Sequence, residues 1–386
     1  MRDEPTSGAA RAPALAPGTK AAVTGASGFL GGRLVELLTM QGVDVTCLVR
    51  RSNAGLRLRQ TGARLLALDL AEPVPVQAAL EGIEVVFHCA YDWADTAWNH
   101  RAISALIAGC QRNGCHLVHV SSYVVYQLPD EGEVTEELPG NASTSGYAHT
   151  KRELEETVLR AFQEQSLSGA VVQPTLVYGP FSGPFTNEPA EMLRFGTVVL
   201  PDQGEGTCNA VYVDDVVSAM TLAAQHPSAV GQRFLVSGPR PVTWREFYEE
   251  MARAAHAKGP QYRAAEAITR ENTKMRKLLR FAADPERVVR RMAQDRRIRR
   301  FVQRAVGALP ALPRQALASR LFTPTSRRSG HVHLPDGSRL GFLRGRATVG
   351  SAKARRELGY APSFDFAAGM VPTARYLREV WERSKD

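Results

Sequence analysis

The fold is decided by the stretch Val23-Thr24-Gly25-Ala26-Ser27-Gly28-Phe29-Leu30-Gly31-Gly32, which joins a short apolar run to a helical pattern. A strand, a glycine-rich turn and a helix in this order form the pyrophosphate site of dinucleotide-binding folds. Gly25 permits the tight turn, Gly28 lets the backbone approach the pyrophosphate, and Gly31 allows close packing of helix and strand. The helix N-terminus favours the anion. The turn therefore predicts dinucleotide contacts from Gly25, Ser27, Gly28, Phe29, Leu30 and Gly31. An ordinary glycine-rich turn is the alternative, because the spacing is G-x-x-G-x-x-G instead of the common G-x-G-x-x-G.

Short apolar runs alternate with helical patterns from this turn to about Val177. The predicted strands are Ala21–Thr24, Val43–Val49, Leu65–Leu68, Val85–His88, Leu117–Ser121, Ala170–Gln173 and a returning strand, Arg233–Val236. Helical patterns between them include Gly32–Met40, Asn99–Asn113 and Tyr147–Gln165. Nearly continuous apolar strands that alternate with helices predict an α/β fold, a Rossmann-type doubly wound parallel sheet covered on both faces.

The length of 386 residues allows a second domain beside this sheet. We expect a disordered leader over 1–18, because this stretch lacks the apolar core of a signal peptide. The Rossmann domain then comprises 19–178 and 209–238. A smaller, discontinuous C-terminal substrate domain comprises 179–208 and 239–386, with a basic helical insertion over 258–348.

The formal net charge of +9 is concentrated in that insertion. Lys258–Thr348 holds 22 Lys and Arg against 6 Asp and Glu, whereas the rest of the chain holds 26 and 33. Within it, residues 284–306 alternate apolar and Arg positions near helical spacing, after a start at Asp284-Pro285-Glu286. Such a helix can contact an anionic membrane surface, an acidic partner or an anionic substrate, or it can pack on the substrate domain with a solvated Arg face. No aromatic interleaving supports nucleic-acid binding.

Cysteine and histidine usage indicates no metal site. The five cysteines form no C-x-x-C, so we expect reduced thiols in a cytoplasmic protein and no disulfide framework. His331 and His333 form an H-x-H pair, for which an exposed strand is the simpler interpretation than a metal site. No stretch approaches the about 18 consecutive apolar residues of a membrane span.

The end of the second strand discriminates between NAD and NADP. An acidic residue there would bind the ribose 2′-hydroxyl of NAD, whereas Arg can pair with the 2′-phosphate of NADP. The strand ends in Val49-Arg50-Arg51, and Asp44 lies at its beginning, on the wrong side of the sheet. Arg50 and Arg51 therefore favour NADP. NAD stays open, because both Arg side chains could instead be solvated.

The catalytic candidates lie in Tyr147-Ala148-His149-Thr150-Lys151, a Y-x-x-x-K motif. On a helix, residues i and i+4 share one face, so the phenol and the ammonium point the same way. A nearby cation favours the phenolate and should lower the pKa of Tyr147 toward working pH. Tyr147 could then exchange a proton with an alcohol or a developing alkoxide. A surface Tyr–Lys pair is the alternative.

With these motifs, the chain resembles the extended short-chain dehydrogenase/reductase family, in its epimerase/dehydratase branch. The resemblance spans about Lys20–Val242 and resumes over Gly350–Tyr376. It includes Val120-Ser121-Ser122-Tyr123 as an active-site segment. It implies that Ser122 orients the substrate oxygen, that Tyr147 transfers the proton, and that Lys151 holds the nicotinamide ribose and tunes Tyr147. It also implies cofactor contacts from Asp69, Leu70, Cys89, Ala90, Tyr91, Ser121 and Pro174.

Departures from the family pattern narrow the chemistry. Family dehydratases place Asp and Glu directly after the catalytic Ser or Thr, but Tyr123 and Val124 stand here, which disfavours dehydration. Many nucleotide-sugar members carry an Arg where this chain has Cys208, and a frequent Arg before Pro174 is Gln173. Asp214-Asp215, another family landmark, predicts a helix N-cap rather than a catalytic pair.

The sequence thus predicts an NAD(P)-dependent oxidoreductase that transfers hydride at a secondary alcohol or ketone carbon of a sugar-like or polyhydroxylated metabolite. A nucleotide-sugar epimerase that retains its cofactor is one alternative, and a non-catalytic NADP-binding regulator is another. The resemblance also implies a homodimer through helices near Asn99–Asn113 and Tyr147–Gln165.

Overall fold

The computed structural model describes residues 15–50, 56–271 and 331–382. They group into two compact units. The first unit draws on Met1–Thr186, Thr207–Val242 and Arg346–Asp386, and the second on Asn187–Gly206 and Thr243–Gly345. Arg51 and the predicted basic helix over 284–306 lie outside the described residues. In the described ranges, no helix has both the length and the apolar character that a membrane crossing requires.

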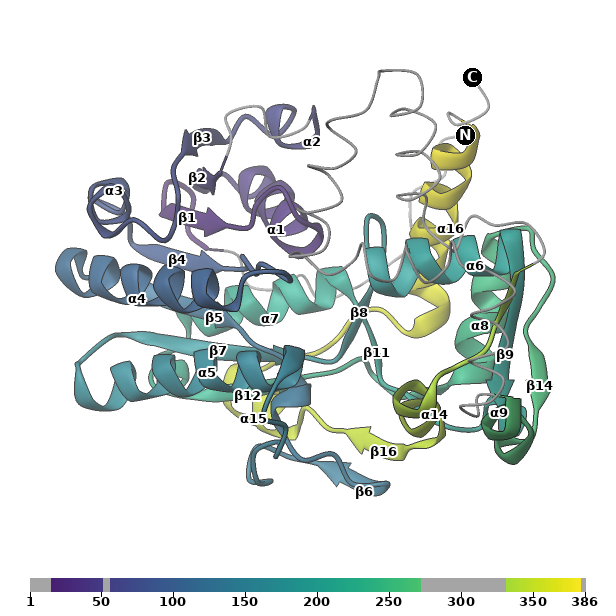
Figure 1. The fold of residues 1–386 in the computed structure, drawn as a ribbon. Helices are drawn as coiled ribbons and strands as arrows, with labels where there is room; N and C mark the ends of the chain where they lie inside the picture. The colour runs from purple at the N-terminus through teal and green to yellow at the C-terminus, as the bar shows by residue number, and fades with distance from the viewer. Residues whose placement is uncertain (1–14, 51–55, 272–330, 383–386) are drawn as a thin grey trace, which may run out of the picture. The chain divides into compact units, whose positions relative to one another are not determined.

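The first unit is built on a seven-stranded sheet in the order β12-β7-β5-β4-β1-β2-β3, in which all neighbouring strands are parallel (Figure 1). Its strands are β1 (Lys20–Thr24), β2 (Asp44–Val49), β3 (Arg64–Ala67), β4 (Val85–His88), β5 (His116–Val120), β7 (Gly169–Pro174) and β12 (Arg233–Val236). They confirm the predicted fold class and the predicted strands.

Helices cover both faces of this sheet (Figure 1). On one face, α1 (Phe29–Met40) and α7 (Val213–Gln225) bury apolar side chains such as Leu34 and Met220 against Val23 and Phe87. On the other face, α3 (Pro73–Ala79), α4 (Thr96–Asn113) and α5 (Gly146–Glu164) form a second core around Ile103. Full burial of each large apolar side chain contributes about 1.5–3 kcal/mol, so the two cores fix the helices on the sheet.

The predicted disordered leader is wrong for its last four residues. The side chain of Leu15 is buried in the core, and the amide of Gly18 donates a hydrogen bond of 2.8 Å to the carbonyl of Gly42. Apolar burial therefore fixes the chain from at least Leu15 onward. Residues 1–14 lie outside the described residues.

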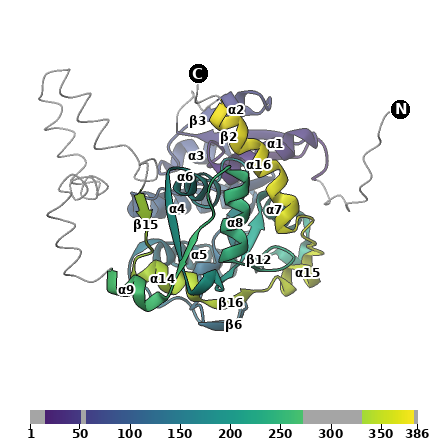
Figure 2. The ribbon, with the colours of Figure 1, turned by 90° about the vertical axis from the view of Figure 1, so that its right-hand side faces the viewer.

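The segment Arg346–Asp386, which the sequence analysis assigns to the substrate domain, groups with the sheet instead. Strand β16 (Arg346–Val349) pairs in parallel with β6 (Glu131–Val134), and the two lie side by side in Figure 2. The hydroxyl of Tyr360 donates to the carbonyl of Ser237 at 2.9 Å. The remaining elements of this unit are α2 (Leu56–Arg59), β8 (Leu176–Tyr178), β10 (Thr207–Cys208), β11 (Ala210–Tyr212), α15 (Ala352–Leu358) and α16 (Phe366–Glu382).

The predicted N-cap role of Asp214 and Asp215 is wrong. Tyr212 occupies the cap position of α7, and both carboxylates lie in its first turn. Asp214 pairs with the Arg33 guanidinium through two contacts of 2.6 and 2.8 Å, which ties α7 to α1. Asp215 accepts hydrogen bonds from the amides of Ser363 and Phe364. Both residues are therefore structural.

The second unit contains a small parallel sheet in the order β14-β9-β15. Its strands are β9 (Gly196–Pro201), β14 (Gln261–Arg263) and β15 (His331–His333), and its helices are α6 (Glu188–Phe195), α8 (Trp244–Ala254), α9 (Ala265–Glu271) and α14 (Gly337–Arg344). The short strand β13 (Val242–Thr243) precedes α8. His331 and His333 thus lie on a strand, and no group of metal-ligand side chains is found in the described part of the chain.

Candidate active site

The predicted site residues gather where β1, β4, β5 and β7 end. Because these strands are parallel, their carboxyl ends lie at the same edge of the sheet, where doubly wound folds bind ligands. The glycine turn follows β1, Cys89-Ala90-Tyr91 follows β4, Ser121-Ser122 follows β5, and Pro174 ends β7.

The glycine turn is shaped by close backbone contacts. Gly25 has a φ of +67°, and a Cβ there would lie 2.7 Å from the amide nitrogen of Ala90. A Cβ on Gly31 would lie 2.4 Å from the carbonyl oxygen of Gly25, so only glycine lets α1 pack so closely on the turn. Gly28 has an ordinary backbone conformation, and a Cβ there would lie 3.1 Å from the carbonyl oxygen of Gly25, a tight contact but a milder one than at Gly31.

The N-terminus of α1 fits a pyrophosphate. Its N-cap residue is Gly28, which supplies no side-chain cap, and no acidic residue lies in the first turn. Ser27 and Gly28 are exposed. A helix end with uncapped amides and no carboxylate favours a bound anion. The turn therefore matches a dinucleotide site on its geometry and on its electrostatics.

Other predicted cofactor residues have defined surroundings. Arg50 follows β2, is largely exposed and pairs with Asp92 at 3.0 Å. Asp69 follows β3 and accepts a hydrogen bond of 2.7 Å from the Trp98 indole. The side chain of Leu70 is buried in the apolar core, so only its backbone could face a cofactor. The amides of Cys89 and Ala90 donate to the backbone and the hydroxyl oxygen of Thr24, which holds this segment against the turn.

Tyr147 and Lys151 lie in the first turns of α5, one helical turn apart, as the motif predicts. The Lys151 ammonium is buried and donates to the carbonyl of Val120 at 2.8 Å, at the end of β5. The hydroxyl of Ser122 lies near enough to the phenol of Tyr147 to lower its pKa, and it accepts from the amide of Val124. The structure therefore brings Ser122, Tyr147 and Lys151 together at one sheet edge.

The pKa of Tyr147 differs from the prediction. Burial raises the pKa of Tyr147 to about 12, although the nearby Ser122 hydroxyl acts in the opposite direction. Burial also lowers the pKa of Lys151 to about 8, while the negative charge of nearby Glu155 opposes this shift. Desolvation of each group outweighs its polar contacts. At neutral pH the phenol is protonated, and the ammonium is largely protonated.

Gln173, which stands where the family often has Arg, completes a buried network behind Lys151. Its amide donates to both carboxylate oxygens of Glu155, at 2.8 and 2.9 Å, and its carbonyl accepts from the Tyr126 hydroxyl at 2.9 Å. Glu155 lies one helical turn after Lys151 on α5 and is also buried. Burial raises the pKa of Glu155. The Glu155 carboxylate thus has an uncharged partner in Gln173 and a charged one in Arg233, whose guanidinium lies 3.5 Å away.

The site also contains an aromatic residue that was not predicted from the sequence, Trp93. Its ring stacks on that of Tyr147, with centroids 4.7 Å apart and an interplanar angle of 20°. Tyr91 contacts both rings edge to face. Tyr91-Asp92-Trp93 directly follows the segment after β4 that the resemblance assigns to the cofactor, and this position is the signal that could have identified Trp93.

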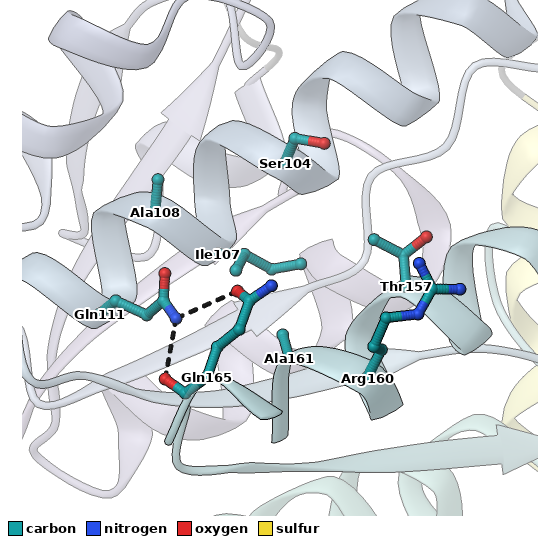
Figure 3. Close-up of a pocket in the computed structure, with 8 residues that line it drawn as sticks. All are labelled: Ser104, Ile107, Ala108, Gln111, Thr157, Arg160, Ala161 and Gln165. Atoms are coloured by element: carbon teal, nitrogen blue, oxygen red, sulfur yellow. Dashed lines mark hydrogen bonds between the residues drawn. The ribbon is translucent and has the colours of Figure 1, made fainter. Parts of the chain in front are cut away.

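A surface groove elsewhere lies between α4 and α5 and is lined by Ser104, Ile107, Ala108, Gln111, Thr157, Arg160, Ala161 and Gln165 (Figure 3). The side chain of Gln111 donates to the backbone and the side chain of Gln165, which joins the two helices at one end. None of the predicted catalytic residues lines this groove. It lies on the two helices through which the resemblance implies a homodimer, and that dimer stays a prediction.

The fold and the site define an NAD(P)-dependent enzyme. The model of the "NAD dependent epimerase/dehydratase family" matches residues 21–237, so the chain belongs to this family. This confirms the expected family, an enzymatic role and dependence on a nicotinamide dinucleotide.

Among similar proteins are two named 2-alkyl-3-oxoalkanoate reductase. The Stenotrophomonas maltophilia protein is 29% identical over 69% of this chain and 86% of its own length. The Shewanella oneidensis protein is 29% identical over 57% of this chain and only 62% of its own length. Among solved structures, an epimerase of Methanothermobacter thermautotrophicus has a TM-score of 0.66 at 17% identity, over 95% of this chain and 94% of that one, and thus shares the fold.

The two glycines should separate packing from ligand binding. We expect Gly31→Ala to lower the free energy of unfolding by about 2–4 kcal/mol, because the added methyl would collide with backbone. We expect Gly28→Ala to change it by less than about 1 kcal/mol but to weaken dinucleotide binding at least tenfold, because the methyl would occupy the approach to the helix end. Urea denaturation and calorimetric titration with NADPH measure the two effects. If Gly28→Ala binds NADPH as tightly as wild type, the glycine turn is not the pyrophosphate site.

The buried ammonium of Lys151 should reduce stability. Because its pKa falls from 10.5 to about 8 on folding, the unfolded state binds more protons between these values, and stability rises with pH across this window. We expect Lys151→Met without cofactor to be more stable than wild type at pH 7, by roughly 1–3 kcal/mol. The difference should shrink by pH 10. Denaturation at both pH values tests this, and a Lys151→Met protein less stable at pH 7 would contradict it.

Proposed function

We propose that this enzyme is an NADP-dependent reductase that converts a ketone to a secondary alcohol. The observation that carries the proposal is the grouping of Ser122, Tyr147 and Lys151 beside a glycine turn that fits a pyrophosphate. When bound, the reduced nicotinamide supplies the hydride. Ser122, Tyr147 and Lys151 then have the roles that the family resemblance gives them.

The protonation states favour reduction. With a pKa of about 12, Tyr147 carries its proton at neutral pH and can donate it to the oxygen that gains negative charge. Ser122 lies beside that phenol, lowers its pKa, and can hold the same oxygen. The Lys151 ammonium places positive charge beside the site and can hold the nicotinamide ribose. Its attachment to the Val120 carbonyl keeps that charge in place.

NADP is the proposed cofactor because a basic residue, and no acidic one, follows β2. Arg50 follows this strand, and Asp44 lies at the opposite end, paired in register with Lys20. The Arg50 side chain is 64% exposed, so it can turn from Asp92 to a 2′-phosphate. A charge-assisted contact with the 2′-phosphate would replace the pair of Arg50 with Asp92, and we therefore expect Arg50 to be required for NADP.

The substrate we propose carries its ketone next to an apolar group. The relatives' name, 2-alkyl-3-oxoalkanoate reductase, specifies such a compound for those proteins. Cys208 is uncharged and buried, which offers no cation to a nucleotide diphosphate. The sugar-like substrate of the sequence analysis stays a prediction from the resemblance. An epimerase would return the hydride to its substrate and consume no NADPH.

Tyr147→Phe should remove the proton donor and leave the cofactor site. We expect kcat for a 3-oxo ester to fall by about 10²–10⁴-fold, with the Kd for NADPH unchanged. Tyr360→Phe is the matched control, because it removes a buried hydroxyl that bonds the Ser237 carbonyl in the same unit. Absorbance at 340 nm follows turnover, and calorimetry gives the Kd. A Tyr147→Phe enzyme with wild-type kcat would overturn the assignment.

Arg50→Glu should reverse the cofactor preference. We expect the ratio of kcat/KM with NADPH to that with NADH to fall by about 10–100-fold, because a charge-assisted contact with phosphate is replaced by repulsion. Arg356→Glu, which makes the same charge change at a largely exposed side chain of α15, is the control. An unchanged ratio in Arg50→Glu would exclude Arg50 from the 2′-phosphate site.

A further inference from the structure

Trp93 combines exposure with contact to the proposed proton donor. It is 74% exposed, although one face of its indole stacks on the Tyr147 ring at 4.7 Å. Tyr91 contacts both residues, with its ring centroid 5.1 Å from that of Trp93 and 5.3 Å from that of Tyr147. The Lys151 ammonium lies 4.8 Å from the Tyr91 ring centroid. The exposed indole of Trp93 therefore lies directly next to Tyr147, the proposed proton donor.

The backbone that carries Trp93 is fixed by its neighbour Asp92. The Asp92 amide donates to the side chain of Asn99 at 2.8 Å, and the Asn99 amide donates back to the Asp92 carbonyl at 2.8 Å. Asn99 is buried on α4, so these two hydrogen bonds attach the segment to that helix. The backbone position of Trp93 is thus fixed by hydrogen bonds of its neighbour.

The charges next to Trp93 are paired within the chain, and the Asp92 carboxylate keeps its two backbone partners when Arg50 turns to a 2′-phosphate. One carboxylate oxygen of Asp92 pairs with Arg50, and the other accepts from the amides of Ala94 and Asp95. The carboxylate of Asp95 accepts from the Trp98 amide as the N-cap of α4. What this segment offers to a ligand at Tyr147 is therefore the apolar face of an indole, which gains free energy when a hydrocarbon covers it.

We propose that Trp93 is a specificity-determining residue, which binds the hydrocarbon chain of the substrate next to the carbonyl that Tyr147 protonates. This inference rests on the proposed function and names the residue that selects its substrate. The carbonyl oxygen meets Ser122 and Tyr147, and the chain lies along the indole. Because Tyr147 and Trp93 are in contact, the site for the carbonyl oxygen and the site for the hydrocarbon chain are adjacent.

Chain-length dependence tests the proposal. The probes are methyl 3-oxoalkanoates with alkyl chains of one to seven carbons, with NADPH. In wild type we expect kcat/KM to rise about twofold per methylene, less than the roughly fourfold that complete burial of a CH₂ would give. In Trp93→Ala the rise should fall below about 1.3-fold per methylene, with the shortest ester little affected. Trp93→Phe should keep most of the rise, and Met40→Ala, which removes an 80% exposed apolar residue of α1, should keep all of it.

A binding measurement separates this proposal from the proposed function. Calorimetry gives the Kd of methyl 3-hydroxydecanoate, which NADPH cannot reduce, for the protein with and without NADPH. We expect Trp93→Ala to weaken this binding at least tenfold and Trp93→Phe by less than threefold. If wild type reduces none of the esters, the proposed function fails and the binding measurement alone decides the role of Trp93.

Three results would overturn the role of Trp93. These are a wild-type rate or affinity independent of chain length, an equal chain-length dependence in Trp93→Ala, and an equal loss for every ester in Trp93→Ala. The last result would mean that the indole only positions Tyr147.

Discussion

The structure depends on one buried cation, the Lys151 ammonium. Its hydrogen bond to the Val120 carbonyl joins the start of α5 to the end of β5, and thereby fixes where Tyr147 meets Ser122. Burial of this charge is unfavourable, as its pKa of about 8 shows. The apolar contacts of α5 with the sheet, through Leu154 and Val158, offset this cost.

Residues around Lys151 keep the local charge low. His88 and His119 stack 5.2 Å apart on the same sheet, and burial together with the Lys151 charge lowers the pKa of His88 to about 3. Burial also lowers the pKa of His119, so both imidazoles are neutral at pH 7. Glu155 is the acidic partner on the same helix, and Gln173 holds its carboxylate without adding a second positive charge. Gln173 thus adds no positive charge to this network, in which the Arg233 guanidinium lies 3.5 Å from the Glu155 carboxylate.

Local patterns predicted the sheet well, because parallel strands buried on both faces must be continuously apolar and the glycine turn has a strict shape. Tyr147 and Lys151 were found for a related reason: a motif with helical spacing places them on one face of α5, whereas Ser122, which follows β5, was predicted only from the family resemblance. The pKa of Tyr147 was not predictable, since spacing shows the nearby cation but not the burial that outweighs it.

Contacts between segments that are distant in sequence could also not be predicted from local sequence patterns. The stack of Trp93 on Tyr147 joins residues 54 positions apart, and the placement of Arg346–Asp386 with the sheet depends on the pairing of β16 with β6. The caps proposed for Asp214 and Asp215 failed because their partners, Arg33 and the amides near Ser363, are remote in sequence.

The central claim is net hydride transfer to a ketone at this site. Its most direct test is incubation of the full-length enzyme with NADPH deuterated at the transferable C4 position and methyl 3-oxodecanoate, followed by mass spectrometry of the ester and quantification of NADP⁺. We expect one deuterium on the carbinol carbon for each NADP⁺ formed, and labelled product formed about 10²–10⁴-fold more slowly by Tyr147→Phe. Unlabelled product, or wild-type turnover without oxidation of NADPH, would contradict the account.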